Sequence, residues 1–353
     1  MTKWGIIGAG EIARVFANGV RSSKNGRIVA VASRTPDRRA ALADDFIIPR
    51  RFSSYEELLA DGDVDAVYVS VIHPDHARWA IAAAQAGKHI LVEKPIAMNA
   101  EEAAAMIEAA RQHDVFLMEA FMYRCHPQSA RLAELIRGGA VGEVLAIRST
   151  MSFSTPFDEK SRLFNRALGG GSILDVGCYP ASMARFIAGA AAGKPFADPV
   201  RVKACGVIGR SGVDTYTAAV AEFPRGIIAE LVCGISCEVP AETTVLGTAG
   251  RLSVPNPWLP SSPARTALKP LPMDTPWPSE KILLWTPARP APTEIVITAD
   301  SDLYAYEADV VDRHIADRQA PAMSWDDSMG NIRLLDAWRK EIGAGFDRDG
   351  GAR

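Results

Sequence analysis

The chain has 353 residues, of which 48% are hydrophobic and 23% are charged, and its formal net charge is −3. This length is too great for one ordinary core and suits two domains. The slightly acidic balance gives no general attraction to nucleic acid or to an anionic membrane, and no apolar run approaches the roughly 20 residues that span a bilayer. Scattered cysteines and an apolar first strand without a basic leader predict a cytoplasmic protein with reduced thiols.

In the first third of the chain, short apolar runs alternate with helical patterns. The runs predict strands at Lys3–Gly8, Ile28–Ser33, Asp65–Ser70, Lys88–Glu93 and Phe116–Glu119. The helical patterns lie at Glu11–Arg21, Pro36–Asp44, from Tyr55, at Ala77–Ala86 and after a capping Asn99. Strands that alternate with helices indicate a parallel sheet with helices on both faces. We therefore predict an α/β Rossmann domain over residues 1–122.

The pattern changes after Tyr123, where a helix at Pro127–Arg137 leads into longer strands. These strands are expected at Glu143–Phe153, Val200–Ile208, Thr215–Phe223, Gly226–Cys233 and Thr243–Gly247. Tight turns between neighbours indicate mostly antiparallel pairing. A proline-rich stretch at 255–292 is expected to be irregular, and helices at Leu303–Asp317 and Ser324–Ile342 close the chain. Residues 123–353 thus form a predicted α+β domain, leaving open whether the closing helices pack back on the first domain.

The stretch "GIIGAGEIA" places Gly8, Gly10 and Ala13 between the first strand and the first helix. In a dinucleotide turn the first glycine permits the tight turn, the second lets backbone approach a pyrophosphate, and the small third residue lets helix pack on strand. The helix N-terminus then offers free N–H groups to the phosphates. The alternative is a purely structural tight turn. We predict dinucleotide binding by Gly8, Ala9, Gly10, Glu11 and Ile12.

The end of the second strand reads "VASRTPDRR" and lacks the acid that usually holds the ribose hydroxyls of NAD. A serine and arginines at this place fit a 2′-phosphate through charge-assisted hydrogen bonds. A solvated basic helix start is the alternative interpretation. We predict that NADP is favoured over NAD, with contacts from Ser33, Arg34, Thr35 and Arg38.

The stretch "HILVEKPIAMN" puts Lys94 at the carboxyl end of a parallel strand. Ligands of open α/β sheets bind in the crevice outside these ends. The following Pro95 disfavours helical backbone at Lys94 and permits a cis bond, and both effects would aim the lysine into the crevice. For an isolated lysine, a surface position at a loop start is the alternative.

The stretch "GGGSILDVGCYP" places Asp175 and Tyr179 four residues apart. They share one face if an α-helix starts near Asp175, and Pro180 is tolerated only in the first turn of such a helix. A helix N-cap for the aspartate and a half-buried aromatic position for the tyrosine are the structural alternatives.

Four stretches in order, "GIIGAGEIA", "AGKHILVEKP", "EAFMYRCHP" and "GGGSILDVGCYP", resemble the Gfo/Idh/MocA family of NAD(P)-dependent oxidoreductases. Tyrosine four residues after the aspartate, with "RLF" and "LGGG" before it, is similar to the branch of dihydrodiol dehydrogenase, D-xylose dehydrogenase and glucose–fructose oxidoreductase. The resemblance implies a Rossmann domain followed by a domain with a large open sheet that makes the subunit contact. It also implies that Lys94, Asp175 and Tyr179 are the catalytic group.

Acid–base chemistry supports this group independently. Oxidation of an alcohol needs a base for the hydroxyl proton, and tyrosine is a poor base at neutral pH. A lysine ammonium within about 4–6 Å favours the tyrosinate and lowers the pKa of the phenol, toward the range in which general acid–base catalysis is efficient. Asp175 would orient the substrate hydroxyl or Lys94. Whether Tyr179 or Lys94 accepts the proton stays open.

Further candidates flank this group. Lining of the cofactor is expected from residues at the strand ends, namely Ser70, His73, His76, Glu93 and Ala120. Weaker candidates for substrate contact are Tyr123, Arg124, Phe153, Arg162 and Trp258, although Arg124 fits an ion pair equally well. The two histidines lack a third ligand, so no metal site is predicted.

These observations predict an NADP-dependent oxidoreductase that interconverts a secondary alcohol or hemiacetal with a ketone or lactone. A sugar or polyol is the expected substrate, and a trans-dihydrodiol is the alternative. A non-catalytic NADP-binding regulator is the rival from another class, which the complete catalytic group disfavours. Neither nucleic acid nor membrane is an expected partner, and a homodimer or homotetramer through the second domain's sheet is expected.

Overall fold

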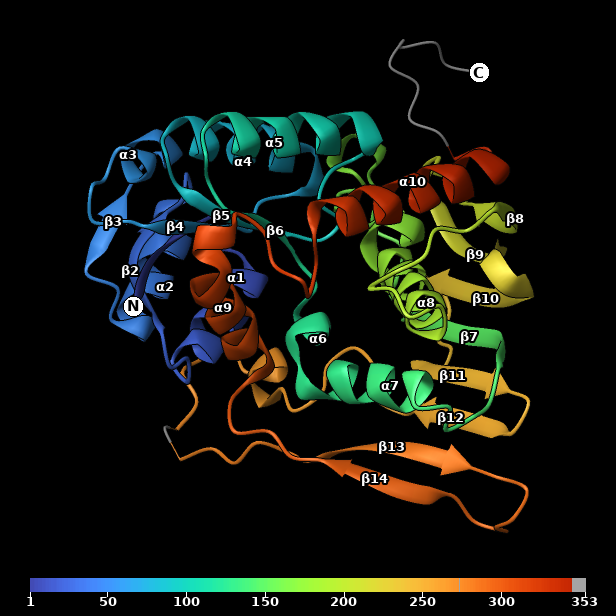
Figure 1. Ribbon diagram of the computed structural model, residues 1–353. Coiled ribbons are helices and arrows are strands. Elements are labelled where there is room, and N and C mark those ends of the chain that lie inside the picture. Colours follow the sequence, from blue (N-terminus) through green and yellow to red (C-terminus); the bar gives the residue numbers. More distant parts are fainter. Residues whose placement is uncertain (273, 345–353) are drawn as a thin grey trace. The chain divides into compact units, whose positions relative to one another are not determined.

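The computed structural model describes residues 1–272 and 274–344 and groups them into two compact units (Figure 1). Unit 1 consists of Met1–Leu132, Asn256–Leu283 and Thr293–Met329. Unit 2 consists of Ala133–Pro255, Leu284–Pro292 and the chain from Gly330 onward. The first unit thus extends past residue 122 and takes in segments from the last third of the sequence. The end of the predicted second domain, residues 345–353, lies outside the described residues.

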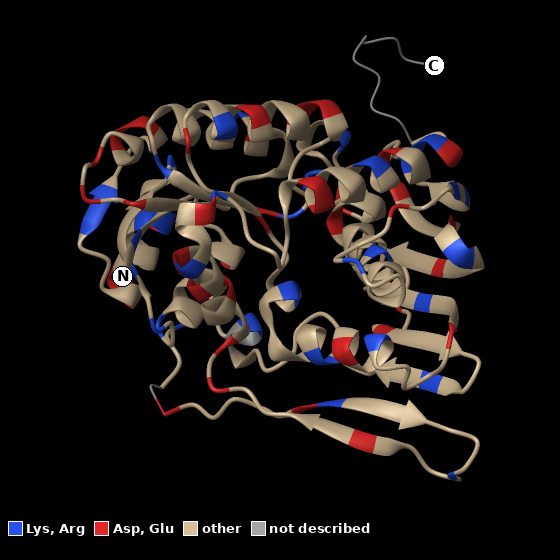
Figure 2. Ribbon diagram, viewed as in Figure 1, with Lys and Arg blue, Asp and Glu red and all other residues tan. Residues whose placement is uncertain are grey.

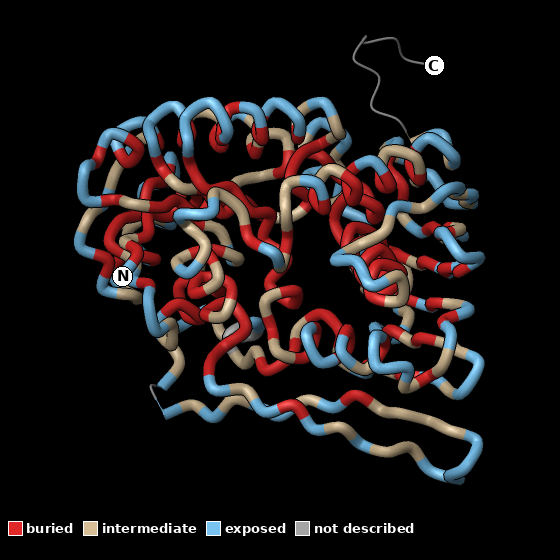
Figure 3. Tube along the Cα trace, in the orientation of Figure 1, coloured by how far each residue is buried: buried red, intermediate tan, exposed pale blue. Residues whose placement is uncertain are grey.

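Within the described residues of unit 1, a six-stranded parallel sheet has the order β3-β2-β1-β4-β5-β6. The strands are β1 Thr2–Ile7, β2 Gly26–Ala32, β3 Arg50–Phe52, β4 Ala66–Val69, β5 His89–Glu93 and β6 Leu117–Ala120. Strands β4 and β6 are buried along their whole length, as are the last residues of β1, β2 and β5 (Figure 3). This burial accounts for the mostly apolar sequence of these strand segments. The predicted Rossmann sheet is confirmed, and β3 is a short addition to it.

Helices cover both faces of this sheet (Figure 1). α4 and α5 pack together on one face, and α1 packs with α9 on the other. The helices of unit 1 are α1 Glu11–Val20, α2 Pro36–Phe46, α3 Tyr55–Leu59, α4 His76–Gln85, α5 Ala100–Gln112, α6 Met122–Cys125 and α9 Leu303–His314. α7 Pro127–Arg137 is divided between the two units. As predicted, Asn99 caps α5 by accepting the N–H of Glu102 at 2.9 Å. The carboxylate of Glu102 accepts the N–H of Met98, the residue before the cap, at 3.1 Å.

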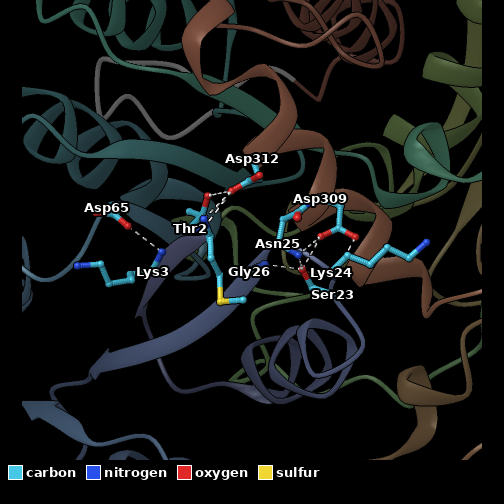
Figure 4. Close-up of polar contacts among 10 residues, drawn as sticks. Thr2, Lys3, Ser23, Lys24, Asn25, Gly26, Asp65, Asp309 and Asp312 are labelled. Carbon is cyan, nitrogen blue, oxygen red and sulfur yellow. Dashed lines mark hydrogen bonds and ion pairs between the residues drawn. The ribbon is translucent and has the colours of Figure 1, made fainter.

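Helix α9 is fastened to the start of the chain through two aspartates (Figure 4). Asp309 accepts the hydroxyl of Ser23 and the N–H of Asn25 in the turn before β2. Asp312 accepts both the N–H and the hydroxyl of Thr2, at 3.1 and 2.6 Å. These contacts join residues about 300 positions apart and explain why this closing helix belongs to the first unit.

The second sheet has eight strands among the described residues, in the order β14-β13-β12-β11-β7-β10-β9-β8. The strands are β7 Val144–Ser152, β8 Arg201–Ile208, β9 Asp214–Phe223, β10 Ile227–Gly234, β11 Glu242–Gly247, β12 Gly250–Val254, β13 Glu280–Trp285 and β14 Thr293–Ile297. β8 with β9, β9 with β10, β7 with β11 and β11 with β12 pair antiparallel, whereas β7 with β10 pairs parallel. This confirms the mostly antiparallel prediction. The expectation of an irregular stretch at 255–292 is wrong at its end, because β13 lies there.

One face of this second sheet packs, at β7 and β10, against α8 Cys178–Ala191, whose side chains are almost all buried. The other face turns outward and carries the exposed apolar residues Tyr216 and Val220 of β9 and Ile228 of β10. Within β9, these exposed positions alternate with buried ones, as the pleat of a strand requires. The last helix is α10 Trp325–Glu341, and the indole of Trp338 donates to the hydroxyl of Thr217 in β9 at 2.9 Å. Both signs of charge are distributed over the helices and strands of each unit (Figure 2).

Candidate active site

The turn between β1 and α1 has the two glycine environments that a dinucleotide turn requires. Gly8 adopts φ 102°, and a Cβ there would lie 3.0 Å from the carbonyl oxygen of Ser70. At Gly10 a Cβ would meet nothing within 4 Å, and no side chain caps α1 at this residue. Packing within the protein therefore requires the first glycine, whereas the second leaves the open N-terminus of α1 accessible. This arrangement fits a pyrophosphate on the helix N-terminus.

The loop after β2 presents arginines at the position where an NAD site would carry an acid. Arg34 has a side chain that is 66% exposed, forms a 3.5 Å ion pair with Asp75 and lies over the ring of Tyr55. Arg39 donates to the carbonyl oxygen of Ser33 at 2.6 Å, and this bond restrains the loop. The hydroxyl of Ser33 accepts the N–H of Thr35 at 3.2 Å, and Arg38 is exposed. The loop is thus fixed while its basic groups stay accessible to an anion.

Lys94 follows directly after β5 and is half-buried, next to a buried acidic group. The carboxylate of Glu93 accepts the hydroxyl of Tyr68 and, at 3.2 Å, the N–H of Lys94. Burial raises the pKa of Glu93. Glu307 of α9 is fully buried, and burial together with Glu93 holds its pKa well above the usual value. The peptide between Lys94 and Pro95 is cis, a form that the sequence allowed.

The loop after β5 is hydrogen-bonded both to the segment that follows β4 and to strand β6. The ring nitrogens of His76 lie 3.0 Å from the carbonyl oxygen of Pro95 and 3.1 Å from that of Val71. Glu119 of β6 accepts the N–H of Ile96 at 2.9 Å. His76 is 0% exposed and His73 is 7% exposed, so the ring of His76 has no surface to offer directly to a cofactor. Ala120, at the end of β6, is likewise buried.

Three of the predicted substrate residues of unit 1 are buried in this structure. Arg124 donates to Asp327 at 2.8 Å, and both side chains are 2% exposed. Of the two interpretations of Arg124, the ion pair is the one observed. The ring of Tyr123 meets that of Trp258 edge to face at 5.4 Å, and neither is exposed. Their contact with substrate stays a prediction.

In unit 2, Asp175 and Tyr179 lie at the junction of two kinds of helix. Asp175 is in a π-helical turn, Ile173–Gly177, and Tyr179 is in the first turn of α8, as is Pro180. A helix does begin near Asp175, and Pro180 lies in the first turn of α8 as expected, but Asp175 itself lies in the π turn. The α-helical spacing that would place Asp175 and Tyr179 on one face therefore does not hold here, because a π turn has more residues than an α turn. Arg162 donates to the carboxylate of Asp175 at 2.9 Å. π turns of this kind occur frequently at functional sites.

The glycine-rich turn before Asp175 depends on a residue that the sequence analysis missed. Asp214, at the start of β9, accepts the hydroxyl of Ser172 and the N–H of Ile173, both at 2.7 Å. Gly171 has φ 119°, and a Cβ there would collide with the carboxylate of Asp214. Burial raises the pKa of Asp214. Phe153, the last substrate candidate, is half-buried and donates its N–H to Gly234 at 3.0 Å.

The predicted catalytic group is divided between the units. Lys94 and the predicted cofactor residues belong to unit 1, whereas Asp175, Tyr179 and Arg162 belong to unit 2. Over the residues described, no cluster of three histidines, cysteines or acids is arranged to hold a metal ion. None of the helices in the described ranges is both long and apolar enough to cross a membrane.

Comparison with known proteins identifies both parts of the chain. Residues 2–121 match the oxidoreductase family with an NAD-binding Rossmann fold, and residues 129–253 match the GFO/IDH/MocA C-terminal domain. Trans-1,2-dihydrobenzene-1,2-diol dehydrogenase of Danio rerio is 33% identical over 98% of both chains. D-xylose 1-dehydrogenase (NADP(+)) 2 of Haloferax volcanii is 34% identical over 98% of this chain and 99% of its own.

Solved structures agree with these relatives. An aldose–aldose oxidoreductase from Caulobacter crescentus, complexed with glycerol, has a TM-score of 0.83 at 25% identity and 97% coverage of both chains. A 3-ketoreductase from Actinomadura kijaniata, in complex with NADP and TDP-benzene, has a TM-score of 0.82 at 25% identity, over 97% of this chain and 98% of its own. The chain therefore belongs to the GFO/IDH/MocA family of oxidoreductases, in the branch that contains dihydrodiol dehydrogenases and D-xylose dehydrogenase.

Proposed function

We propose that the protein is an NADP-dependent oxidoreductase that acts on a secondary alcohol or hemiacetal carbon of a sugar or polyol. The observation that carries this proposal is the full-length similarity to two dehydrogenases, each at 33–34% identity over 98% of this chain. The glycine environments of the β1–α1 turn support a dinucleotide, because Gly10 leaves space that no protein atom uses.

The preference for NADP rests on the loop after β2. Ser33 and Arg34 occupy the position of the ribose-binding acid, and Arg38 follows one helical turn later. An exposed guanidinium suits a 2′-phosphate because it binds phosphate in a planar, two-pronged manner. The Haloferax volcanii relative is named for NADP(+), and the ketoreductase structure contains NADP. In this proposal Gly8, Gly10 and the N-terminus of α1 hold the pyrophosphate.

The chemistry that a bound nicotinamide supplies is hydride acceptance in oxidation and hydride donation in reduction. The protein's own task is to move the hydroxyl proton, which we assign to Lys94, Asp175 and Tyr179. Tyr179 is the proposed proton acceptor or donor, and the Lys94 ammonium stabilises its anionic form. Asp175 orients the substrate hydroxyl or the lysine, and it forms an ion pair with Arg162 at 2.9 Å.

A trans-dihydrodiol is the second candidate substrate, because the Danio rerio relative is named for that activity. Initial rates with aldoses, polyols and trans-dihydrobenzenediol, each with NADP⁺ and with NAD⁺, separate the candidates through the absorbance of the reduced nicotinamide. We expect turnover with an aldose or polyol and a higher kcat/KM for NADP⁺. Turnover confined to the diol selects the second candidate, and a preference for NAD⁺ contradicts the assignment of Arg34. Absence of turnover across the panel, with NADP still bound, favours a regulator instead.

We also propose an oligomeric state and a cellular compartment for the protein. The outward face of the second sheet carries Tyr216, Val220 and Ile228 as exposed apolar side chains on adjacent strands. Exposed apolar patches of this kind mark association surfaces, so we propose a homodimer or homotetramer through this sheet. The free cysteines suit a reducing compartment, the cytoplasm. Sedimentation velocity measures the assembly, and Val220→Glu is expected to shift it toward the monomer.

A further inference from the structure

The buried imidazole of His76 contacts two loops, the one that follows β4 and the one that follows β5. His76 begins α4, is 0% exposed, and has one ring nitrogen facing each loop. Nδ1 lies 3.0 Å from the carbonyl oxygen of Pro95, which directly follows Lys94. Nε2 lies 3.1 Å from the carbonyl oxygen of Val71, in the loop after β4. Both partners are therefore acceptors that belong to backbone segments at the strand ends.

The chemistry of imidazole makes these two contacts unequal. Burial lowers the pKa of His76 to about 4, so the ring is neutral at ordinary pH. A neutral imidazole carries one N–H, and its other nitrogen presents a lone pair. His76 can therefore donate to Pro95 or to Val71, but not to both at once. The nitrogen that carries the proton decides which loop is held.

We propose that His76 is a positioning residue that donates from Nδ1 to the carbonyl oxygen of Pro95 and thereby holds the backbone corner carrying Lys94. This inference rests on the proposed function, in which Lys94 takes part in the proton transfer. On either side of Pro95, Lys94 donates its N–H to the carboxylate of Glu93 at 3.2 Å, and Ile96 donates its N–H to the carboxylate of Glu119 at 2.9 Å. The bond from His76, at the start of α4, is made to Pro95, which lies between Lys94 and Ile96.

The titratable groups that face His76 agree with this arrangement. Burial of the ring lowers the pKa of His76, and the nearby charge of Lys94 lowers it further. The ring of His73 meets that of His76 edge to face at 5.6 Å. A proton on both nitrogens would bind both loops, but the burial of the ring and the nearby ammonium disfavour it. The neutral ring with one donated bond is thus the resting arrangement.

Two substitutions of His76 distinguish the bond to Pro95 from the bond to Val71. In His76→Asn the side-chain amide reaches the place of Nδ1 and keeps a donor for Pro95, whereas in His76→Gln it reaches the place of Nε2 and keeps a donor for Val71. Because a misplaced reacting group can cost about a hundredfold in rate, we expect kcat to fall about tenfold to a hundredfold in His76→Gln. We expect His76→Asn to stay within about threefold of the wild type. The affinity for NADP should change little in either variant.

A matched control lowers stability without touching either loop. Ala83 is buried on the same helix, and Ala83→Gly weakens α4 without a bond to Pro95 or Val71. Its kcat should equal that of the wild type at a temperature where all variants are folded. Equal losses of kcat in His76→Asn and His76→Gln, or equal retention, overturn the proposal. A control that loses kcat as His76→Gln does would also overturn it, because general weakening of α4 then explains the effect.

A second measurement does not depend on turnover or on any variant that fails to fold. Nitrogen-15 NMR of histidine-labelled wild-type protein reports the tautomer of His76 and the exchange protection of its ring proton. We expect a protonated, exchange-protected Nδ1, and in Lys94→Met we expect a higher pKa for His76 because a neighbouring positive charge is removed. A proton on Nε2 overturns the proposal. If the wild type shows no turnover with any substrate, the proposed function fails while this measurement still decides the hydrogen bond.

Discussion

His126 makes the stability of the first unit sensitive to acid, and the size of the effect follows from its surroundings. The ring is 1% exposed and meets the ring of Tyr306 edge to face at 5.3 Å. Its Nδ1 accepts the N–H of Gln128 at 3.1 Å, just inside α7, so the single proton of the neutral ring is on Nε2. Burial lowers the pKa of His126 from 6.5 to about 4. Protonation would also break the bond from Gln128.

The direction and size of the change in folding stability with pH follow from the linkage between protonation of His126 and folding. Between about pH 6.5 and pH 4, the unfolded chain binds a proton at this position that the folded chain refuses. The stability contributed by the neutral ring is therefore complete above about pH 6.5 and is lost as the pH falls toward 4. With the two pKa values, 6.5 unfolded and about 4 folded, the loss is about 2 kcal/mol at about pH 5 and about 3 kcal/mol in the limit.

Substitution of His126 by asparagine isolates this contribution. The amide oxygen of His126→Asn takes the place of Nδ1 and can accept the N–H of Gln128, as asparagine does at helix N-caps, but it does not titrate. Lost packing against Tyr306 shifts the variant's stability by an amount independent of pH. Denaturant unfolding at several pH values should show the wild type losing about 2 kcal/mol relative to the variant between about pH 8 and pH 5. A difference that does not change with pH refutes this reasoning.

Two further substitutions test the cofactor loop and the buried ion pair. Arg34→Ala should raise the KM for NADP⁺ about tenfold or more, since hydrogen bonds to charged groups contribute about 1.5–3 kcal/mol, while the KM for NAD⁺ changes much less; equal changes in initial-rate measurements contradict the assignment. Asp327→Ala leaves a guanidinium buried and unpaired, and should lower the free energy of unfolding by about 3–5 kcal/mol. Glu108→Ala, which removes an exposed ion pair, should cost about 0–1 kcal/mol in the same denaturant experiment, so similar costs would be inconsistent with the burial of Arg124.

Local sequence patterns were sufficient for the elements whose structure depends on near neighbours. The glycines of the β1–α1 turn, the cap at Asn99 and the position of Lys94 after β5 are each determined within a few residues. Alternation of strands and helices likewise predicted the parallel sheet. β13 was missed because prolines and turn residues surround it, although in the sheet it lies between β12 and β14.

The parts of the site that the sequence did not predict depend on contacts between residues far apart in the chain. Asp214 holds the turn at Gly171 from about 40 positions away, and nothing near Asp214 in sequence indicates that role. The donor geometry of His76 depends on Val71 and on Pro95, which lies on the other side of β5. The π turn at Asp175 follows from the packing of that segment, since an α-helical continuation has the same sequence pattern. Sequence motifs thus indicated the site residues, but not the distant residues that hold them in position.

The central claim, proton transfer through Lys94 in an NADP-dependent oxidation, is tested by one kinetic comparison. With the preferred substrate of the wild type, kcat is measured for Lys94→Met and for the matched control Lys24→Met, which removes an exposed lysine of the same unit. NADP binding is followed in parallel by fluorescence. We predict that Lys94→Met lowers kcat by about 10²–10⁴-fold with NADP binding retained, and that the control turns over like the wild type. Turnover by Lys94→Met within about threefold of the wild type would contradict the account.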